Sequence, residues 1–272
     1  MPLPKPNEAK RKALLNDALK PLDSAEREKL FKPLEILFEC VLTDDALLHE
    51  DVDNPIEHHT TVLNHMMAIA KGEAFSWDEM RRAAAIAILH DMQPSPKVTR
   101  EMRDAAKTAE QKAELDLKNI KNRIVHMGVG SHRAREKLAE ANARNGHVFF
   151  TDEDADAVCA VIAIHDIPSI DLPIPSNARM AVAFREADRL WMQTEAGVRA
   201  DLARKDPPID NPTTQQCVDQ ATKNLKSYRK ERKLYDPQTE HFHDDETFFR
   251  TRAGYNIFTQ LRFDWQKLAG TA

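Results

Sequence analysis

The sequence predicts an all-α protein, and three observations support this fold class. Apolar residues recur at intervals of three to four positions along most of the chain, and no alternating strand pattern competes with them. Only 7 of the 272 residues are glycine, whereas an average chain of this length has about 19. Alanine, leucine, glutamate, lysine and arginine, which all favour helix, are abundant. We therefore expect long helices with few tight turns between them.

The apolar periodicity divides the chain into segments that we expect to be helical. They cover residues 8–19, 24–43, 55–71, 78–92, 100–120, 124–144, 152–166, 176–193, 213–232 and 245–267. Ser76 and Thr151 precede two of these segments and are suitable N-caps, because their hydroxyl groups can accept hydrogen bonds from free backbone N–H groups. Pro94 and Pro96 must end the helix that contains His90, since proline cannot continue the helical hydrogen-bond ladder.

We interpret residues 1–272 as a single all-helical domain, because a chain of this length can bury one large core. Its core covers residues 55–193, preceded by packing helices in residues 1–54 and followed by a C-terminal extension, 206–272. The proline-rich segment DPPIDNPTT marks the start of that extension. The highly charged run at 105–123 is typical of a solvated helix face.

Composition and charge exclude several classes of partner. The net charge of -5 supplies no basic field of the kind that holds duplex nucleic acid. No stretch approaches the length of a membrane span, and the first residues lack the apolar core of a secretory signal. Cys40, Cys159 and Cys217 lack metal-ligand spacing, and we interpret them as buried thiols in a reducing compartment. We therefore expect a cytoplasmic protein with no membrane partner.

The pair His90-Asp91 is the first candidate for chemistry. It ends the run RRAAAIAILHD, in which small and aliphatic residues predict a helix that is buried on most sides. Placing an ionisable pair at the end of such a helix is costly unless its charge is compensated. A metal ion would compensate it, and a carboxylate can bridge two divalent ions. A histidine satisfied by a backbone carbonyl next to a capping aspartate is the alternative.

Four other polar residues lie on apolar helical stripes and should point inward: His58, His126, His165 and Asp188. A single inward histidine is more often a satisfied core residue than a metal ligand. Several inward histidines and aspartates on separate helices indicate a shared metal centre.

The order and spacing of these motifs resemble the HD-domain superfamily of His-Asp metal-dependent phosphohydrolases and related di-iron oxygenases. The opening of such a domain resembles residues 58–97, HHTTVLNHMMAIAKGEAFSWDEMRRAAAIAILHDMQPSPK. Later helices of the family resemble HMGVGSHRAREKL, AVCAVIAIHD and AFREADRLWM. The resemblance covers residues 55–193, about half the chain. It implies an HD-domain helical bundle with helical extensions at both ends.

Carried over residue by residue, the resemblance implies a core metal set with Asp91 as the bridge between two ions. The implied ligands are His58, His90, Asp91 and Asp188, with His126 and His165 completing a second ion. His59 and His65 compete with His58 for the first position, since His65 lies seven residues on along the same face. Asp166 stands where many relatives have a second histidine. The implied cofactors are two divalent ions, such as Fe, Mn, Mg, Ni, Co or Zn.

The resemblance also implies hydrolysis of a small phosphorylated substrate, such as a nucleotide. Asp91 and Lys97 would then be catalytic, although many relatives have this lysine nearer to the motif aspartate. Positive side chains would neutralise the phosphate, and by position the candidates are Lys97, Arg133, Arg185 and Arg189.

Two other functions stay open at this point. A minority branch of the superfamily holds a mixed-valent di-iron centre that cleaves C–C or C–P bonds with dioxygen, and His65 fits its shorter spacing to the His-Asp pair. A non-catalytic binding protein would have a broken ligand position, and none is broken.

The aromatic and arginine-rich C-terminal extension could form a lid over the site or a homodimer contact.

Overall fold

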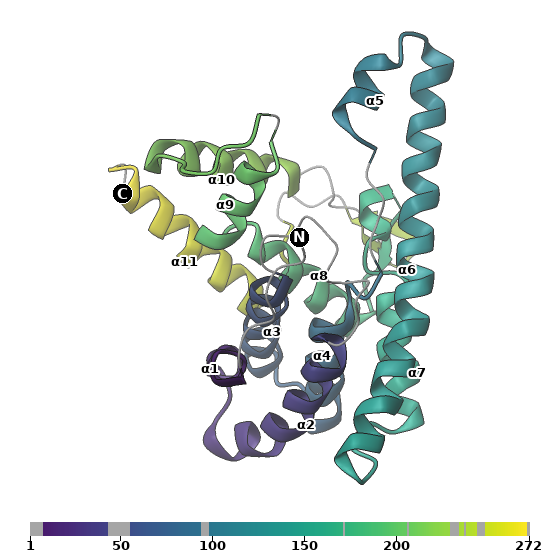
Figure 1. Ribbon diagram of the computed structural model, residues 1–272, viewed down its shortest axis with the longest axis vertical. Coiled ribbons are helices and arrows are strands. Elements are labelled where there is room, and N and C mark those ends of the chain that lie inside the picture. Colours follow the sequence, from purple (N-terminus) through teal and green to yellow (C-terminus); the bar gives the residue numbers. More distant parts are fainter. Residues whose placement is uncertain are drawn as a thin grey trace.

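The computed structural model describes residues 8–42, 55–93, 98–170, 172–205, 207–228, 234–236, 238–243 and 248–270. This part of the chain is mainly helical, which confirms the predicted fold class (Figure 1). The helices are α1 (Glu8–Ala18), α2 (Ser24–Leu42), α3 (Pro55–Gly72), α4 (Trp77–Leu89), α5 (Arg100–Ala105), α6 (Ala109–Asn145), α7 (Asp152–Ile162), the 3-10 helix η2 (Ile167–Ile170), α8 (Arg179–Trp191), α9 (Glu195–Ala203), α10 (Thr214–Tyr228) and α11 (Arg252–Leu268).

Helix α4 is the centre of the bundle. Every side chain from Ala83 to Leu89 is fully buried, because α4 packs against α2, α3, α7 and α8. Its start is fixed as predicted: the hydroxyl of Ser76 accepts from the backbone N–H of Glu79, and the carboxylate of Glu79 accepts from the backbone N–H of Ser76. Four of the seven residues from 83 to 89 are alanine, and such small side chains let neighbouring helices approach closely. The end of α4 therefore lies deep inside the protein.

Helices α1 and α2 belong to the same hydrophobic core as α3 and α4, as expected for packing elements. Helices α6 and α7 lie on one side of the bundle, and α9, α10 and α11 lie on the other (Figure 1). Helix α5 and the N-terminal half of α6 extend beyond the body of the protein (Figure 1). No helix within the described ranges is long and apolar enough to span a membrane.

The boundaries around α6 differ from the prediction. The expected helices at 100–120 and 124–144 are instead a short α5 and one helix of 37 residues, α6. Thr108 and Gln111 form a capping box that starts α6, and no glycine or proline interrupts the chain near residue 122. Gly146 ends the helix with a φ of 74°, a left-handed conformation that glycine adopts without strain. Most side chains of residues 107–118 are exposed, so this part of the charged run is a solvated face as predicted, whereas residues 119–123 are mostly half-buried.

Other differences lie in the second half of the chain. Helix α7 ends at Ile162, so that His165 and Asp166 lie in the turn after it rather than in a helix. Helix α9 was not predicted. It is capped by Thr194, and a Cβ on Gly197 would lie only 2.1 Å from the carbonyl oxygen of Trp191. The close approach of α8 and α9 therefore depends on glycine at this position.

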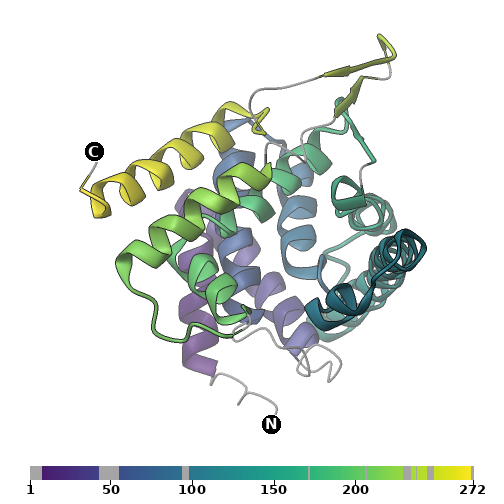
Figure 2. The same ribbon diagram turned by 90° about the horizontal axis from the view of Figure 1, so that it is seen from above.

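A small three-stranded sheet also was not predicted. Strand β1 (Ile174–Pro175) pairs in parallel with β2 (Leu234–Asp236), and β2 pairs antiparallel with β3 (His241–His243). Strands β2 and β3 project from the edge of the helical body (Figure 2). Strands of two or three residues are too short to produce an alternating pattern in the sequence.

Candidate metal centre

Six polar side chains converge where α3, α4, α6, α7 and α8 meet. They form two groups of potential metal ligands, and within each group the ligand atoms lie within 4.8 Å of one another. The first group is His58, His90 and Asp188, and the second is Asp91, His126 and His165. The structure thus brings together all six residues that the sequence singled out, from five separate elements.

Separate elements deliver the members of the first group. His58 lies on the first turns of α3, His90 is the C-cap of α4, and Asp188 lies on α8. The Nε2 atoms of His58 and His90 are 3.0 Å apart. The Asp188 carboxylate is 3.6 Å from the first of these nitrogens and 3.8 Å from the second. Two imidazole nitrogens and one carboxylate oxygen therefore face the same small volume.

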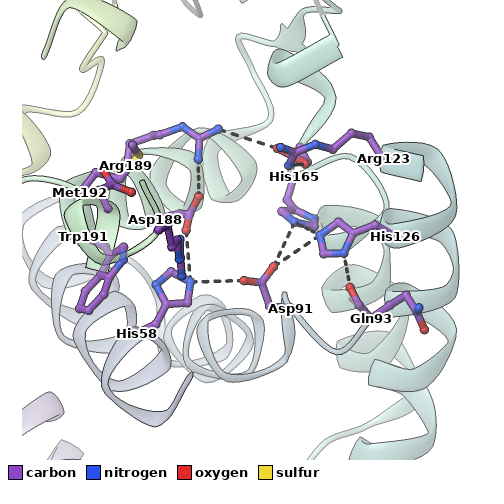
Figure 3. A pocket seen from close by; sticks show the side chains of 13 residues that line it. His58, Asp91, Gln93, Arg123, His126, His165, Asp188, Arg189, Trp191 and Met192 are labelled. Carbon is purple, nitrogen blue, oxygen red and sulfur yellow. Dashed lines mark hydrogen bonds and ion pairs between the residues drawn. The ribbon is translucent and has the colours of Figure 1, made fainter. Parts of the chain in front are cut away.

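Asp91 lies between the two groups (Figure 3). Its Oδ2 is 3.4 Å from Nε2 of both His58 and His90. Its Oδ1 is 3.4 Å from Nε2 of His126 and 3.9 Å from that of His165. One carboxylate therefore turns one oxygen to each group, as a bridging ligand of two cations would.

Backbone carbonyl groups fix the orientation of three of the histidine rings. Nδ1 of His90 donates to the carbonyl of Ala87 at 3.1 Å, and Nδ1 of His165 donates to that of Ile162 at 2.7 Å. Nδ1 of His126 donates to the carbonyl of Gln93. A neutral imidazole carries one proton, so in its neutral form each of these rings would present an unprotonated Nε2 to the site. Metal-ligating histidines are commonly oriented in this way.

The pair His126 and His165 is the clearest sign of a cation site. Their Nε2 atoms are 3.2 Å apart, and both rings already use Nδ1 as a donor. In the neutral rings, two lone pairs would then face each other in a place where burial makes repulsion costly. A cation between these nitrogens would convert the repulsion into coordination. The residues present therefore fit a metal ion.

The negative charges of the carboxylates in the site shift the pKa values of the neighbouring histidines. Burial lowers the pKa of His90, but the charges of Asp91 and Asp188 outweigh this effect and raise the pKa to about 9. Burial also lowers the pKa of His126, and the hydrogen bond to Asp91 reverses the shift. The pKa of Asp91 is held well below its usual range, against its desolvation, by the surrounding histidines. Without a metal ion, protons thus supply the positive charge that the carboxylates require.

The structure distinguishes His58 from the two histidines that compete with it. His59 is buried and donates from Nδ1 to the carbonyl of Ile88 at 2.7 Å. His65 is buried beside the backbone of Ala187, and burial lowers its pKa to about 4. Among the described residues, the potential ligand groups include neither of them. The chain direction of α3 explains this, since His65 lies nearly two turns beyond His58.

The centre forms the floor of a pocket with a cavity of about 240 Å³. Three arginines line this pocket together with the ligands: Arg123, Arg189 and Arg204. Arg123 pairs with Asp166, and Nη2 of Arg189 is 3.8 Å from the same carboxylate. Trp191 and Met192 form an apolar part of the wall. Arginines beside a metal centre suit an anionic ligand.

The other expected substrate-binding residues lie elsewhere. Arg185 is buried, donates from Nη2 to the carbonyl of Phe248 at 2.9 Å and lies over the ring of the same residue. Arg133 donates to the carbonyl of Met92 at 3.1 Å, behind the segment that carries Asp91. Neither residue lines the described pocket. Lys97 lies outside the described residues.

Sequence reasoning missed Arg123 and Arg204 as pocket residues. Arg123 belongs to the charged run that was interpreted as solvated, yet it precedes His126 by three residues and shares its face of α6. That spacing was the signal that could have identified it. Arg204 is the C-cap of α9, a helix that the sequence did not predict, so its position could not be anticipated.

The three cysteines are buried thiols, as predicted, and form no disulfide with one another. They lie apart from both ligand groups.

In comparisons with known proteins, no family model, no curated protein and no solved structure matches this chain.

Proposed function

We propose that this protein is a metal-dependent phosphohydrolase of the HD-domain type, which acts on a small phosphorylated substrate. The observation that carries the proposal is the position of Asp91, with one oxygen toward His58 and His90 and the other toward His126 and His165. A carboxylate in this position, at the floor of a pocket that arginines line, suits a dinuclear centre that binds an anion.

The six residues would hold two divalent ions, one in each group, with Asp91 shared between them. When bound, such ions lower the pKa of a water molecule and neutralise charge on a phosphate. Hydrolysis adds a water molecule across the P–O ester bond. The water oxygen bonds to phosphorus, and the ester oxygen leaves as an alcohol with a proton.

The chain itself supplies orientation and charge. The carbonyl groups that accept from Nδ1 of His90, His126 and His165 hold the rings in their ligand orientation. Phe184 is fully buried and packs against the rings of His90 and His165, so this side of the site is apolar. Arg189 lies next to Asp188 and would bind phosphate oxygens. For Lys97, a catalytic role is still a prediction from the resemblance.

The position of His65 favours hydrolysis over oxygenase chemistry. The shorter spacing of the di-iron branch would require His65 as the first ligand, whereas His58 lies in the site and His65 faces Ala187. A non-catalytic binding protein would be expected to lack a ligand. All six positions carry residues that can bind a metal, which supports an enzyme.

Metal analysis combined with hydrolase assays tests the proposal. We expect about two divalent ions per chain and release of phosphate from a panel of phosphomonoesters and phosphodiesters. Asp91→Ala should lose both, while Asp116→Ala, at an exposed aspartate on α6, should lose neither. A mixed-valent iron signal in electron paramagnetic resonance, without hydrolysis of any ester, would refute the proposal in favour of the oxygenase alternative.

A further inference from the structure

Two arginines and one aspartate lie beside the candidate metal ligands in the lining of the same pocket. We call Arg123, Arg189 and Asp166 the arginine clamp. Arg123 comes from α6 and Arg189 from α8, so the two guanidinium groups reach the pocket from different elements. Figure 3 shows the two side chains extending toward each other on one side of Asp91. The clamp therefore links α6 and α8 along one side of the pocket.

Asp166 holds the clamp together. Its side chain is only 6% exposed, and its Oδ2 accepts from Nη1 of Arg123. Its Oδ1 accepts from the hydroxyl of Ser169 at 2.6 Å and lies 3.8 Å from Nη2 of Arg189. Arg189 also donates to Ser169 at 3.1 Å and to Asp188 at 2.9 Å. A single carboxylate is thus shared by two cations, and their charge exceeds its own.

The charge of the pocket indicates an anionic ligand only when the metal centre is filled. Its lining contains three arginines and four aspartates, so that with neutral histidines its net charge is -1. Two divalent ions would change this value to +3. Arg189 would then lose part of its attraction to Asp188, because a metal ion would take over that carboxylate. The clamp would be left with a guanidinium charge that a substrate can neutralise.

We propose that the arginine clamp selects phosphomonoesters over phosphodiesters, an inference that rests on the proposed hydrolase function. A terminal phosphate has three non-bridging oxygens, whereas a diester has two. If the two metal ions engage two of these oxygens, only a monoester retains a further charged oxygen for the guanidinium groups. Arginine is suited to bind it, since its planar fork pairs with phosphate oxygens. A diester would offer these guanidinium groups no further charged oxygen, so it would bind with fewer charge-assisted hydrogen bonds.

The rest of the pocket suits the leaving group of such an ester. Trp191 and Met192 offer apolar surface on the wall next to His58 (Figure 3). Trp191 packs against the His58 ring with a centroid distance of 5.2 Å, so the apolar wall directly adjoins a candidate metal ligand. An organic group esterified to the phosphate could lie against this wall. The inferred substrate class is thus a phosphomonoester with a partly apolar organic moiety.

Binding of inorganic phosphate to the metal-loaded protein tests the clamp without relying on catalysis. The variants are Arg123→Gln and Arg189→Gln, and Lys121→Gln is the control, because it removes the same charge from the exposed face of α6. By isothermal titration calorimetry, each clamp variant should bind phosphate about 10-fold more weakly or worse. The control should bind like the wild type. Metal content should stay unchanged in all three variants.

Hydrolysis of p-nitrophenyl phosphate and of bis(p-nitrophenyl) phosphate gives the second measurement. The wild type should have the higher kcat/KM for the monoester, and the clamp variants should lose this preference while the control keeps it. Arg123→Lys, which retains charge but not the planar fork, should fall between them and replaces Arg123→Gln if that variant does not fold.

The outcomes separate the two proposals. Ester hydrolysis with unchanged phosphate binding in both clamp variants would overturn the clamp alone, as would a preference for the diester. If no ester is hydrolysed, the proposed function and the selectivity inferred from it are both overturned, even where phosphate binding depends on the arginines.

Discussion

The affinity of the centre for a divalent ion should increase with pH, because the metal must displace a proton from His90. Burial lowers the pKa of this histidine, but Asp91 and Asp188 raise it to about 9. An imidazole nitrogen binds a metal only in its unprotonated form. At any pH below 9, metal binding therefore releases a proton. An unperturbed histidine would stop competing above a pH of about 6.5.

The size of the effect follows from this shift. For one displaced proton, the dissociation constant changes about tenfold for each pH unit below the pKa. From pH 8 to pH 6 we therefore expect the metal to bind about 100-fold more weakly, which corresponds to about 2.7 kcal/mol. The hydrogen bond that His126 donates to Asp91 also raises the pKa of His126, against its burial. A second proton would make the dependence steeper at low pH.

Equilibrium dialysis with Mn²⁺ across this pH range measures the effect directly. His132→Ala is the matched control: it removes an exposed histidine from α6, paired only with Glu136 at 3.5 Å among the described contacts, and should leave the pH dependence unchanged. A dissociation constant that changes less than about threefold between pH 6 and pH 8 would show that no ligand is protonated there, and the reasoning would fail.

Three further predictions concern single residues. His58→Ala should lose bound metal, whereas His65→Ala should retain it in elemental analysis; the reverse result would restore the oxygenase spacing. Asp154→Ala should lower the free energy of unfolding by about 3–5 kcal/mol in urea titrations, because the buried carboxylate pairs with two arginines at 2.7 Å; a loss below about 1 kcal/mol would mean that water replaces the pair. Gly197→Ala should lower the melting temperature, since its Cβ would lie 2.1 Å from the Trp191 carbonyl oxygen; an unchanged melting curve would refute the need for this close approach.

Several features of the fold could be predicted because they depend on local sequence. The caps Ser76 and Thr151 mark helix starts through hydrogen bonds within four residues, and both form capping boxes in the structure. The buried run in α4 was visible as an uninterrupted aliphatic stretch. The end of α7 was not visible, since the apolar pattern continues to His165 while the helix stops at Ile162. Tertiary contacts decide such ends, and a single sequence does not contain them.

The candidate site shows the same division. The six ligands could be found because each polar residue interrupts an apolar stripe. The choice between His58 and His65 could not be made from spacing, because both lie on one face of α3 and only the positions of α4 and α8 separate them. The clamp could not be found from Asp166 alone, since its partners come from α6 and α8.

A metal ion bound at this centre would also cross-link helices that are distant in the sequence. Its ligands come from α3 through α8, so only the folded chain brings them together. A ligand that binds the native state alone raises the free energy of unfolding, by about 2.7 kcal/mol at 100 times its dissociation constant. The apolar core around α4 is complete beneath the site, so the ions would reinforce an existing fold rather than create one. The supply of metal would then change the free energy of unfolding as well as the activity.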